Sequence, residues 1–98
     1  MIRSFRDSGT RDVWDDERSK RAMKTCPADL WTVAQRKLDQ LNQAAGLLDL
    51  RVPPKNRLEA LKGDRKGQHS TRINDQYRIC FRWSESGPED VEIVDYHR

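Results

Sequence analysis

The side chains best suited to chemistry stand together near the end of the sequence, where Asp95, Tyr96 and His97 follow the largely apolar run Val91 to Val94. A carboxylate, a phenol and an imidazole can donate, accept or orient protons, and imidazole titrates near neutral pH, at about 6.5. A terminus without a function more often ends in unstructured polar residues. The pattern therefore predicts a strand that carries proton-transfer groups and is held opposite a basic, substrate-binding surface.

The direction of these three side chains is not fixed by the pattern alone. If the strand stays regular, Asp95 and His97 share one face and Tyr96 takes the other. Two arrangements then stay open. Either His97 acts on the substrate with Asp95 orienting it, or the end of the strand twists so that Tyr96 also turns in.

A second candidate is Arg78, which lies within the run Tyr77 to Trp83. The odd positions of this run are apolar and the even ones are Arg78, Cys80 and Arg82, so a strand would separate an apolar face from a basic one. An arginine placed between apolar residues is costly unless it reaches an anion. That anion is either a substrate phosphate or an acidic side chain of the protein, and the acidic candidates are Glu59, Asp75 and Glu92.

Basic residues are concentrated between Lys55 and Arg82, with eight against three acidic ones, whereas 83–98 holds one basic and five acidic residues. Such a block is either the footprint of phosphate binding or an ordinary solvated face. The segment 62–67 contains two glycines and four charges, which suits a loop with basic tips or an exposed loop without a ligand. His69 has no evident partner, so packing or hydrogen bonding explains it better than catalysis.

Composition argues against several other classes of protein. Ninety-eight residues suggest one domain, and a charged fraction of 36% against 35% hydrophobic predicts a lean core. No apolar run reaches the length of a membrane span and no secretory signal is visible, so we expect a full-length cytoplasmic chain that contacts no membrane. Cys26 and Cys80 are expected to be reduced thiols, and neither a metal site, a phosphate loop nor another cofactor site is indicated.

The first half of the sequence predicts a short strand and two helices. The strand is Ile2 to Phe5, and 7–10 supplies turn and N-cap residue types. Arg11 to Met23 is interpreted as a helix with few apolar anchors, and a stronger helix begins at Cys26-Pro27 and ends near Gly46. The stronger helix should lay an apolar stripe on a sheet. This stripe consists of Leu30, Val33, Ala34, Leu38, Leu41 and Ala45.

The second half predicts an antiparallel meander. An ordered connector, 47–56, contains Pro53-Pro54, which ends any regular element. Asn74 to Gln76 has tight-hairpin chemistry, because Asn and Asp tolerate positive φ. The chain is therefore one α+β domain, residues 1–98, with helices on one face of one sheet. The four expected strands of the meander are Arg57–Leu61, Gln68–Asn74, Tyr77–Ser84 and Asp90–Tyr96.

Taken together, these segments resemble the HigB-type "killer" toxins of the RelE/ParE superfamily. The resemblance covers essentially the whole chain and is weakest from Asp7 to Ala28. It rests on Arg57-Leu58-x-x-Leu61-Lys62-Gly63-Asp64, Gly67-x-x-Ser70-x-Arg72-Ile73-Asn74, Tyr77-Arg78-Ile79-x-Phe81 and Asp95-Tyr96-His97. The resemblance implies a RelE-like fold and a ribosome-dependent mRNA endonuclease. It also implies a HigA-like helix-turn-helix antitoxin encoded nearby, and contact with operator DNA only through the antitoxin complex.

Carried over residue by residue, the family's active site falls on Lys62, Arg78, Asp95, Tyr96 and His97. Related toxins often have a histidine three residues before the matched lysine, where this chain has Glu59. A carboxylate can still act as the base or orient a neighbour, so Glu59 joins the catalytic candidates and the division of acid and base roles stays open. His97 would be the general acid or base with Asp95 orienting it, Lys62 and Arg78 would hold the phosphate, and Tyr96 would stack on a base or hydrogen-bond to the backbone. Contacts to mRNA or ribosomal RNA are expected from Arg57, Arg65, Lys66, Arg72 and Arg82.

Two other interpretations share this fold. A ParE-type toxin inhibits DNA gyrase and cleaves no RNA, and it would have no chemical need for Lys62, Arg78 and a terminal histidine. The second is a non-catalytic RNA-binding module, in which Glu59 marks the lost activity. A gyrase supercoiling assay tests the first of these, and RNA binding without cleavage on ribosomes would favour the second.

Overall fold

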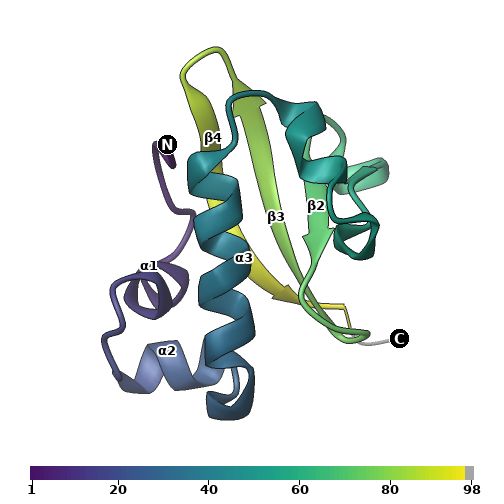
Figure 1. Ribbon diagram of the computed structural model, residues 1–98. Coiled ribbons are helices and arrows are strands. Elements are labelled where there is room, and N and C mark those ends of the chain that lie inside the picture. The colour runs from purple at the N-terminus through teal and green to yellow at the C-terminus, as the bar shows by residue number, and fades with distance from the viewer. Residues whose placement is uncertain (97–98) are drawn as a thin grey trace.

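The computed structural model describes residues 1–96, and the expected site residue His97 lies outside them. Four antiparallel strands form one sheet in the order β1-β2-β3-β4, and the long helix α3 crosses one face of it (Figure 1). The expected α+β architecture is confirmed. The strands are β1 (Glu59–Ala60), β2 (His69–Arg72), β3 (Tyr77–Ser84) and β4 (Gly87–Asp95).

The helical elements are more numerous and shorter than the sequence predicts. The α-helices are α1 (Ser8–Trp14), α2 (Lys20–Thr25) and α3 (Trp31–Gln43). The 3-10 helices are η1 (Ala28–Leu30), η2 (Leu47–Arg51), η3 (Pro54–Asn56) and η4 (Gly63–Arg65). None of the helices in 1–96 has the length and apolar character needed to cross a membrane.

The expected first strand at Ile2–Phe5 is reduced to one parallel bridge, between Phe5 and Val91 of β4. The physical reason is the early start of α1, whose N-cap Asp7 accepts a hydrogen bond from the Thr10 backbone N–H. Farther along the same edge of β4, the Ile93 N–H therefore donates to the Thr10 hydroxyl, at 3.0 Å, and not to the backbone of a neighbouring strand. The edge of β4 is covered all the same.

The expected helix from Arg11 to Met23 is wrong, because two helices with a turn between them occupy this segment. Ser19 caps α2 by accepting from the Ala22 N–H, and the buried carboxylate of Asp12 binds both Ser19 Oγ at 2.6 Å and Arg21 Nε at 2.5 Å. These polar contacts fix α2 against α1. Gly9 permits the close approach, since a Cβ there would lie 2.0 Å from Thr25 Oγ1.

The stronger helix also differs at both ends from its prediction. Pro27 caps η1, α3 itself begins at Trp31, and the C-cap is Ala44 where Gly46 was expected. Trp31 was not expected in the apolar stripe, yet it is buried with its indole N–H donating to Cys26 O at 2.8 Å. Ala45, expected in the stripe, is exposed.

The core lies between α3 and the sheet. Ala34, Leu38 and Leu41 of α3 pack in one cluster with Ile79 and Phe81 of β3 and with the β4 residues Val91 and Ile93. Strand β3 has the predicted bounds and the predicted alternation, since Ile79 and Phe81 face this cluster. The other three strands differ from their predicted bounds, and β1 keeps only two residues of the expected five.

The β2–β3 turn forms by a mechanism other than the one expected. Asn74 Oδ1 accepts from the backbone N–H groups of Gln76 and Tyr77, at 2.9 and 2.7 Å. Within residues 1–96, the non-glycine positions with positive φ lie elsewhere, at Asp16, Arg57 and Asp90. The turn therefore depends on the Asn74 side chain and not on a left-handed backbone.

Candidate active site

The face of the sheet opposite α3 carries the polar side chains of three strands. Ser70 of β2, Cys80 of β3 and Glu92 of β4 lie side by side in the register, and Arg72 and Arg78 form the next row. This is the basic face that the alternation in β3 predicts. At the end of the sheet near the β2–β3 turn, the face hollows into a pocket.

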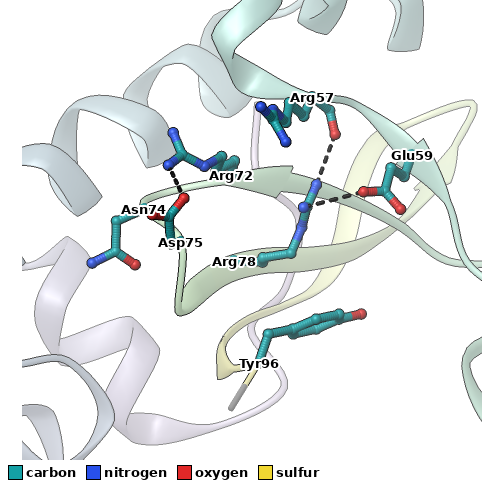
Figure 2. A pocket seen from close by; sticks show the side chains of 7 residues that line it. All are labelled: Arg57, Glu59, Arg72, Asn74, Asp75, Arg78 and Tyr96. Atoms are coloured by element: carbon teal, nitrogen blue, oxygen red, sulfur yellow. Dashed lines mark hydrogen bonds and ion pairs between the residues drawn. The ribbon is translucent and has the colours of Figure 1, made fainter. Parts of the chain in front are cut away.

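The pocket has a volume of about 280 Å³ and is lined by three guanidinium groups, two carboxylates, one carboxamide and one phenol (Figure 2). It brings together three of the expected catalytic residues, Glu59, Arg78 and Tyr96. It also contains Arg57 and Arg72, which the sequence suggested only as electrostatic contacts. Its complete lining is Arg57, Glu59, Arg72, Asn74, Asp75, Arg78 and Tyr96.

Arg78 is the most fully held of these side chains, with 13% of its side chain exposed. Its Nε donates to Ser70 Oγ at 2.9 Å and its Nη2 donates to the backbone O of Arg57 at 2.7 Å. Its Nη1 lies 3.1 Å from Glu59 Oε1. The salt bridge considered for Arg78 is therefore present, with Glu59 as the acid, and it sits inside the pocket.

The carbonyl that binds Arg78 is aimed by an unusual backbone conformation. Arg57 has φ 46° and ψ 55°, a left-handed geometry that is uncommon for a residue with a side chain. The preceding Asn56 is fully buried and donates its Nδ2 to Leu50 O and Val52 O, at 3.1 and 3.3 Å. Lys37 Nζ of α3 donates to Asn56 Oδ1 at 2.7 Å, so the loop before β1 is tied to the long helix.

This tie also places a lysine among other cations. Burial lowers the pKa of Lys37, and the neighbouring charges of Arg36, Lys55 and Arg72 lower it further. Arg72 in turn pairs with Asp75 of the β2–β3 turn, and that hydrogen bond lowers the pKa of the Asp75 carboxyl. Arg72 therefore stands between the Lys37 ammonium, whose pKa it helps to lower, and the Asp75 carboxylate that it binds.

Tyr96 forms the opposite wall. Its ring centroid lies 5.9 Å from the Arg78 guanidinium carbon, and its backbone N–H donates to Gln76 O. Burial raises the pKa of the Tyr96 phenol, so the phenol stays protonated at neutral pH. Tyr96 continues the alternation of Glu92 and Val94, and for that reason it reaches the pocket without a twist of β4.

Asp95 and Lys62 are not brought into the pocket. The Asp95 side chain is exposed and accepts from Gln76 Nε2 at 3.2 Å, opposite Tyr77 in the register. Lys62 is exposed and precedes η4. Within residues 1–96, the pocket therefore lacks two of the residues that the family comparison in the sequence suggested for the active site.

The remaining basic candidates lie along the same face but outside the pocket. Arg65 Nη1 contacts Glu92 Oε1 at 2.7 Å, and that hydrogen bond raises the pKa of Arg65. Arg82 Nε lies 3.6 Å from Asp90 Oδ2 near the other end of the sheet, and Lys66 is exposed in the loop after η4. These arginines are thus already paired with acidic side chains of β4.

His69 and the cysteines have structural surroundings. The His69 ring stacks on Phe81 with centroids 6.2 Å apart, which is the packing contact expected for it. Cys26 and Cys80 are buried free thiols, as expected. In the part of the chain from residue 1 to 96, no three His, Cys, Asp or Glu side chains gather closely enough to hold a metal ion.

Sequence reasoning missed Asn56 and Asn74 as residues that shape the pocket. Asn74 carried a usable signal, because an Asn-Asp turn after a strand that contains Arg72 places polar side chains at the end of that strand. Asn56 carried none, since its partner Lys37 is 19 residues away.

Comparison with known proteins gives a consistent result. The model for the RelE-like toxin of the type II toxin–antitoxin system HigB matches residues 3–97. Toxin HigB-1 of Vibrio cholerae is 37% identical over 83 residues, which are 85% of this chain and 84% of that toxin. An uncharacterized protein of Haemophilus influenzae is 37% identical over 60 residues, covering 61% of this chain and 59% of its own. In the Staphylococcus aureus YoeB–YefM complex, one chain has the same fold, with a TM-score of 0.61, 14% identity, and coverage of 100% of this chain and 99% of that one.

Proposed function

The chain belongs to the RelE-like toxins of HigB type II toxin–antitoxin systems, and from this membership we propose that it is an endoribonuclease that cleaves mRNA on translating ribosomes. The observation that carries the proposal is the Arg78 guanidinium, which is fixed in a pocket between Arg57, Arg72 and the Tyr96 ring. Guanidinium groups suit phosphate and an aromatic ring suits an unstacked base. The pocket therefore fits one nucleotide of a single strand.

The proposed cleavage is attack of a ribose 2′-hydroxyl on the adjacent phosphate. It needs a base for that hydroxyl, an acid for the leaving 5′-oxygen and a cation for the charged phosphorane. We assign stabilisation of the charged phosphorane to Arg78, because Ser70 and the Arg57 carbonyl hold its guanidinium in place before substrate arrives. The product is a 2′,3′-cyclic phosphate or the 3′-phosphate derived from it.

Proton transfer is assigned to His97, which follows Tyr96 directly in the chain, with Asp95 orienting or tuning it. Tyr96 is assigned to stacking on the base or to donating a hydrogen bond from its protonated phenol. Lys62, Arg65, Lys66 and Arg82 are assigned to contacts with mRNA or ribosomal RNA outside the pocket.

The proposed partners follow from the same membership. The S. aureus relative of this fold was solved with YefM, and we propose that this chain is likewise held by an antitoxin, of the HigA-like helix-turn-helix kind. Operator DNA would be contacted through that complex only. Action on the 70S ribosome would take place in the cytoplasm.

The test is to map mRNA 5′ ends on translating ribosomes with the purified protein and with Arg78→Ala. Loss of a preorganised cation at a phosphorane typically lowers the rate by about 10²–10³-fold. Arg11→Ala is the matched control, because Arg11 is an exposed arginine of α1 that pairs with Asp15. Equal cleavage by Arg78→Ala and Arg11→Ala would contradict the assigned site, and gyrase inhibition without mRNA cleavage would favour the ParE-type activity.

A further inference from the structure

The three contacts of Arg78 differ in what they do for the guanidinium. Ser70 Oγ and the Arg57 backbone O are uncharged acceptors on fixed parts of the fold, a strand interior and a loop tied to α3. They orient Arg78 without neutralising it. Glu59 is the charged contact, and its Oε1 lies 3.1 Å from Nη1 (Figure 2).

Glu59 is held far less firmly than the group it neutralises. Its side chain is 55% exposed, against 13% for Arg78. It lies on β1, a strand of two residues at the edge of the sheet. Within residues 1–96, Arg78 is the one cation paired with this carboxylate. An exposed carboxylate on a short edge strand can swing into water at little cost, because surface ion pairs are weak.

The charges of the pocket indicate what would displace it. Arg72 is paired with Asp75 and Arg78 with Glu59, so of the three pocket arginines Arg57 is the one without an acidic partner among the described residues. Figure 2 shows the Arg57 side chain above the space between Arg72 and Arg78. A phosphodiester that binds Arg57 and Arg78 together would compete with the Glu59 carboxylate for the Arg78 guanidinium.

We propose that Glu59 is a specificity-determining internal counter-ion, which occupies the anion-binding edge of Arg78 in the free protein and gives way to an RNA phosphodiester. The identity of the ligand rests on the proposed function. In this role one negative charge replaces another at Arg78. An anion that Arg57 binds too weakly does not displace the Glu59 carboxylate and therefore does not reach Arg78.

The test is the affinity of Glu59→Gln for an RNA analogue that cannot be cleaved because it lacks the attacking 2′-hydroxyl. The probe is a single-stranded tetranucleotide with 2′-deoxy sugars, and the readout is the ¹⁵N–¹H signal of Arg78 Nε during titration. Because an exposed ion pair contributes at most about fivefold to an equilibrium constant, we expect the dissociation constant to fall about three- to fivefold. Glu59→Asp, which withdraws the carboxylate by one methylene, should give an intermediate value.

Asp15→Asn is the matched control. It removes the same charge, from an acid that pairs with Arg11 on the other side of the molecule and has a similar exposure of 49%. This variant should bind within about twofold of the parent, since exposed charges far apart are screened. Inorganic phosphate, titrated in parallel, should move the Arg78 signal in Glu59→Gln and not in the parent.

The outcomes separate the two proposals. An unchanged or higher dissociation constant in Glu59→Gln, or no movement of the Arg78 signal with the tetranucleotide, would overturn the counter-ion role, and a higher one would make Glu59 a positioning residue for Arg78. Tighter binding in Glu59→Gln together with intact mRNA on ribosomes would support the counter-ion role and reject the endonuclease.

Discussion

Replacement of Asn56 by alanine should destabilise the protein far more than its position in a loop suggests. The side chain makes two hydrogen bonds to backbone carbonyls and accepts one from the Lys37 ammonium. Neutral hydrogen bonds contribute about 1 kcal/mol each and one to a charged group about 1.5–3 kcal/mol. Water entering beside Lys37 recovers part of this, so we expect a loss of about 3 kcal/mol in the free energy of unfolding.

The assay is urea unfolding followed by circular dichroism, with the midpoint falling and the slope unchanged. In a thermal scan, the same loss corresponds to roughly 12–24 °C for a domain of this size. Asn42→Ala is the control, because Asn42 makes one hydrogen bond, to the Ile2 N–H, and should cost about 1 kcal/mol. Equal losses in the two variants would refute the role assigned to Asn56.

A second readout tests the link from this loop to the site. Asn56 precedes Arg57, whose carbonyl holds Nη2 of Arg78. If the loop positions that carbonyl, the Arg78 Nε signal should shift in Asn56→Ala under conditions where the variant is still folded, and should stay in place in Asn42→Ala. An unmoved signal would separate the stability of the loop from the geometry of the pocket.

Two further predictions concern the helical side of the molecule. Burial raises the pKa of the Cys26 thiol from 9.0 to about 11, so as pH rises the thiol ionises first in the unfolded chain. Up to about 2–3 kcal/mol of the free energy of unfolding should therefore be lost between pH 9 and pH 11. Between pH 7 and pH 10.5, Cys26→Ala should lose less stability than the parent, and an equal loss would contradict the assignment. Gly9→Ala should lower the free energy of unfolding in urea by about 2 kcal/mol or more, because the added Cβ would lie 2.0 Å from Thr25 Oγ1. Gly46→Ala is the control: the added carbon meets open space, so the free energy of unfolding should change by less than about 0.5 kcal/mol.

The parts of the fold that the sequence predicted are those in which local pattern and burial agree. In β3, the alternation around Ile79 and Phe81 coincides with the core face, and the strand was predicted with its observed bounds. The failures have causes that a local pattern does not contain. The Ile93 N–H is bonded by Thr10, 83 residues away in the chain, and the break between α1 and α2 depends on Asp12 binding Ser19 and Arg21. Such contacts leave no periodic trace.

The candidate site divides in the same way. The alternation of β3 placed Arg78 on the polar face, whereas the direction of Tyr96 stayed open until the structure put its ring centroid 5.9 Å from the Arg78 guanidinium carbon. Lys62 could not be placed, since it stands at the start of a 3-10 turn whose direction no pattern fixes. The inclusion of Arg57 in the pocket depends on a left-handed backbone that is unusual for arginine and had no sequence signal.

The arrangement also changes what the basic block between residues 55 and 82 does. Half of its eight basic residues are paired with acids: Arg65 with Glu92, Arg72 with Asp75, Arg78 with Glu59 and Arg82 with Asp90. Two of these acids come from β4, so the acidic end of the sequence neutralises part of the block when β4 pairs with β3.

The other four basic residues of the block, Lys55, Arg57, Lys62 and Lys66, are exposed and have no acidic partner within the described residues. An unpaired cation that binds a phosphate releases the RNA's condensed counterions, which gives a salt-dependent and sequence-independent attraction. A paired arginine must first exchange its carboxylate, so it gains only when the phosphate fits its geometry better than the carboxylate does. Under the proposed function, the exposed cations would gather an RNA strand, and the paired arginines of the pocket would select the phosphate that is correctly placed.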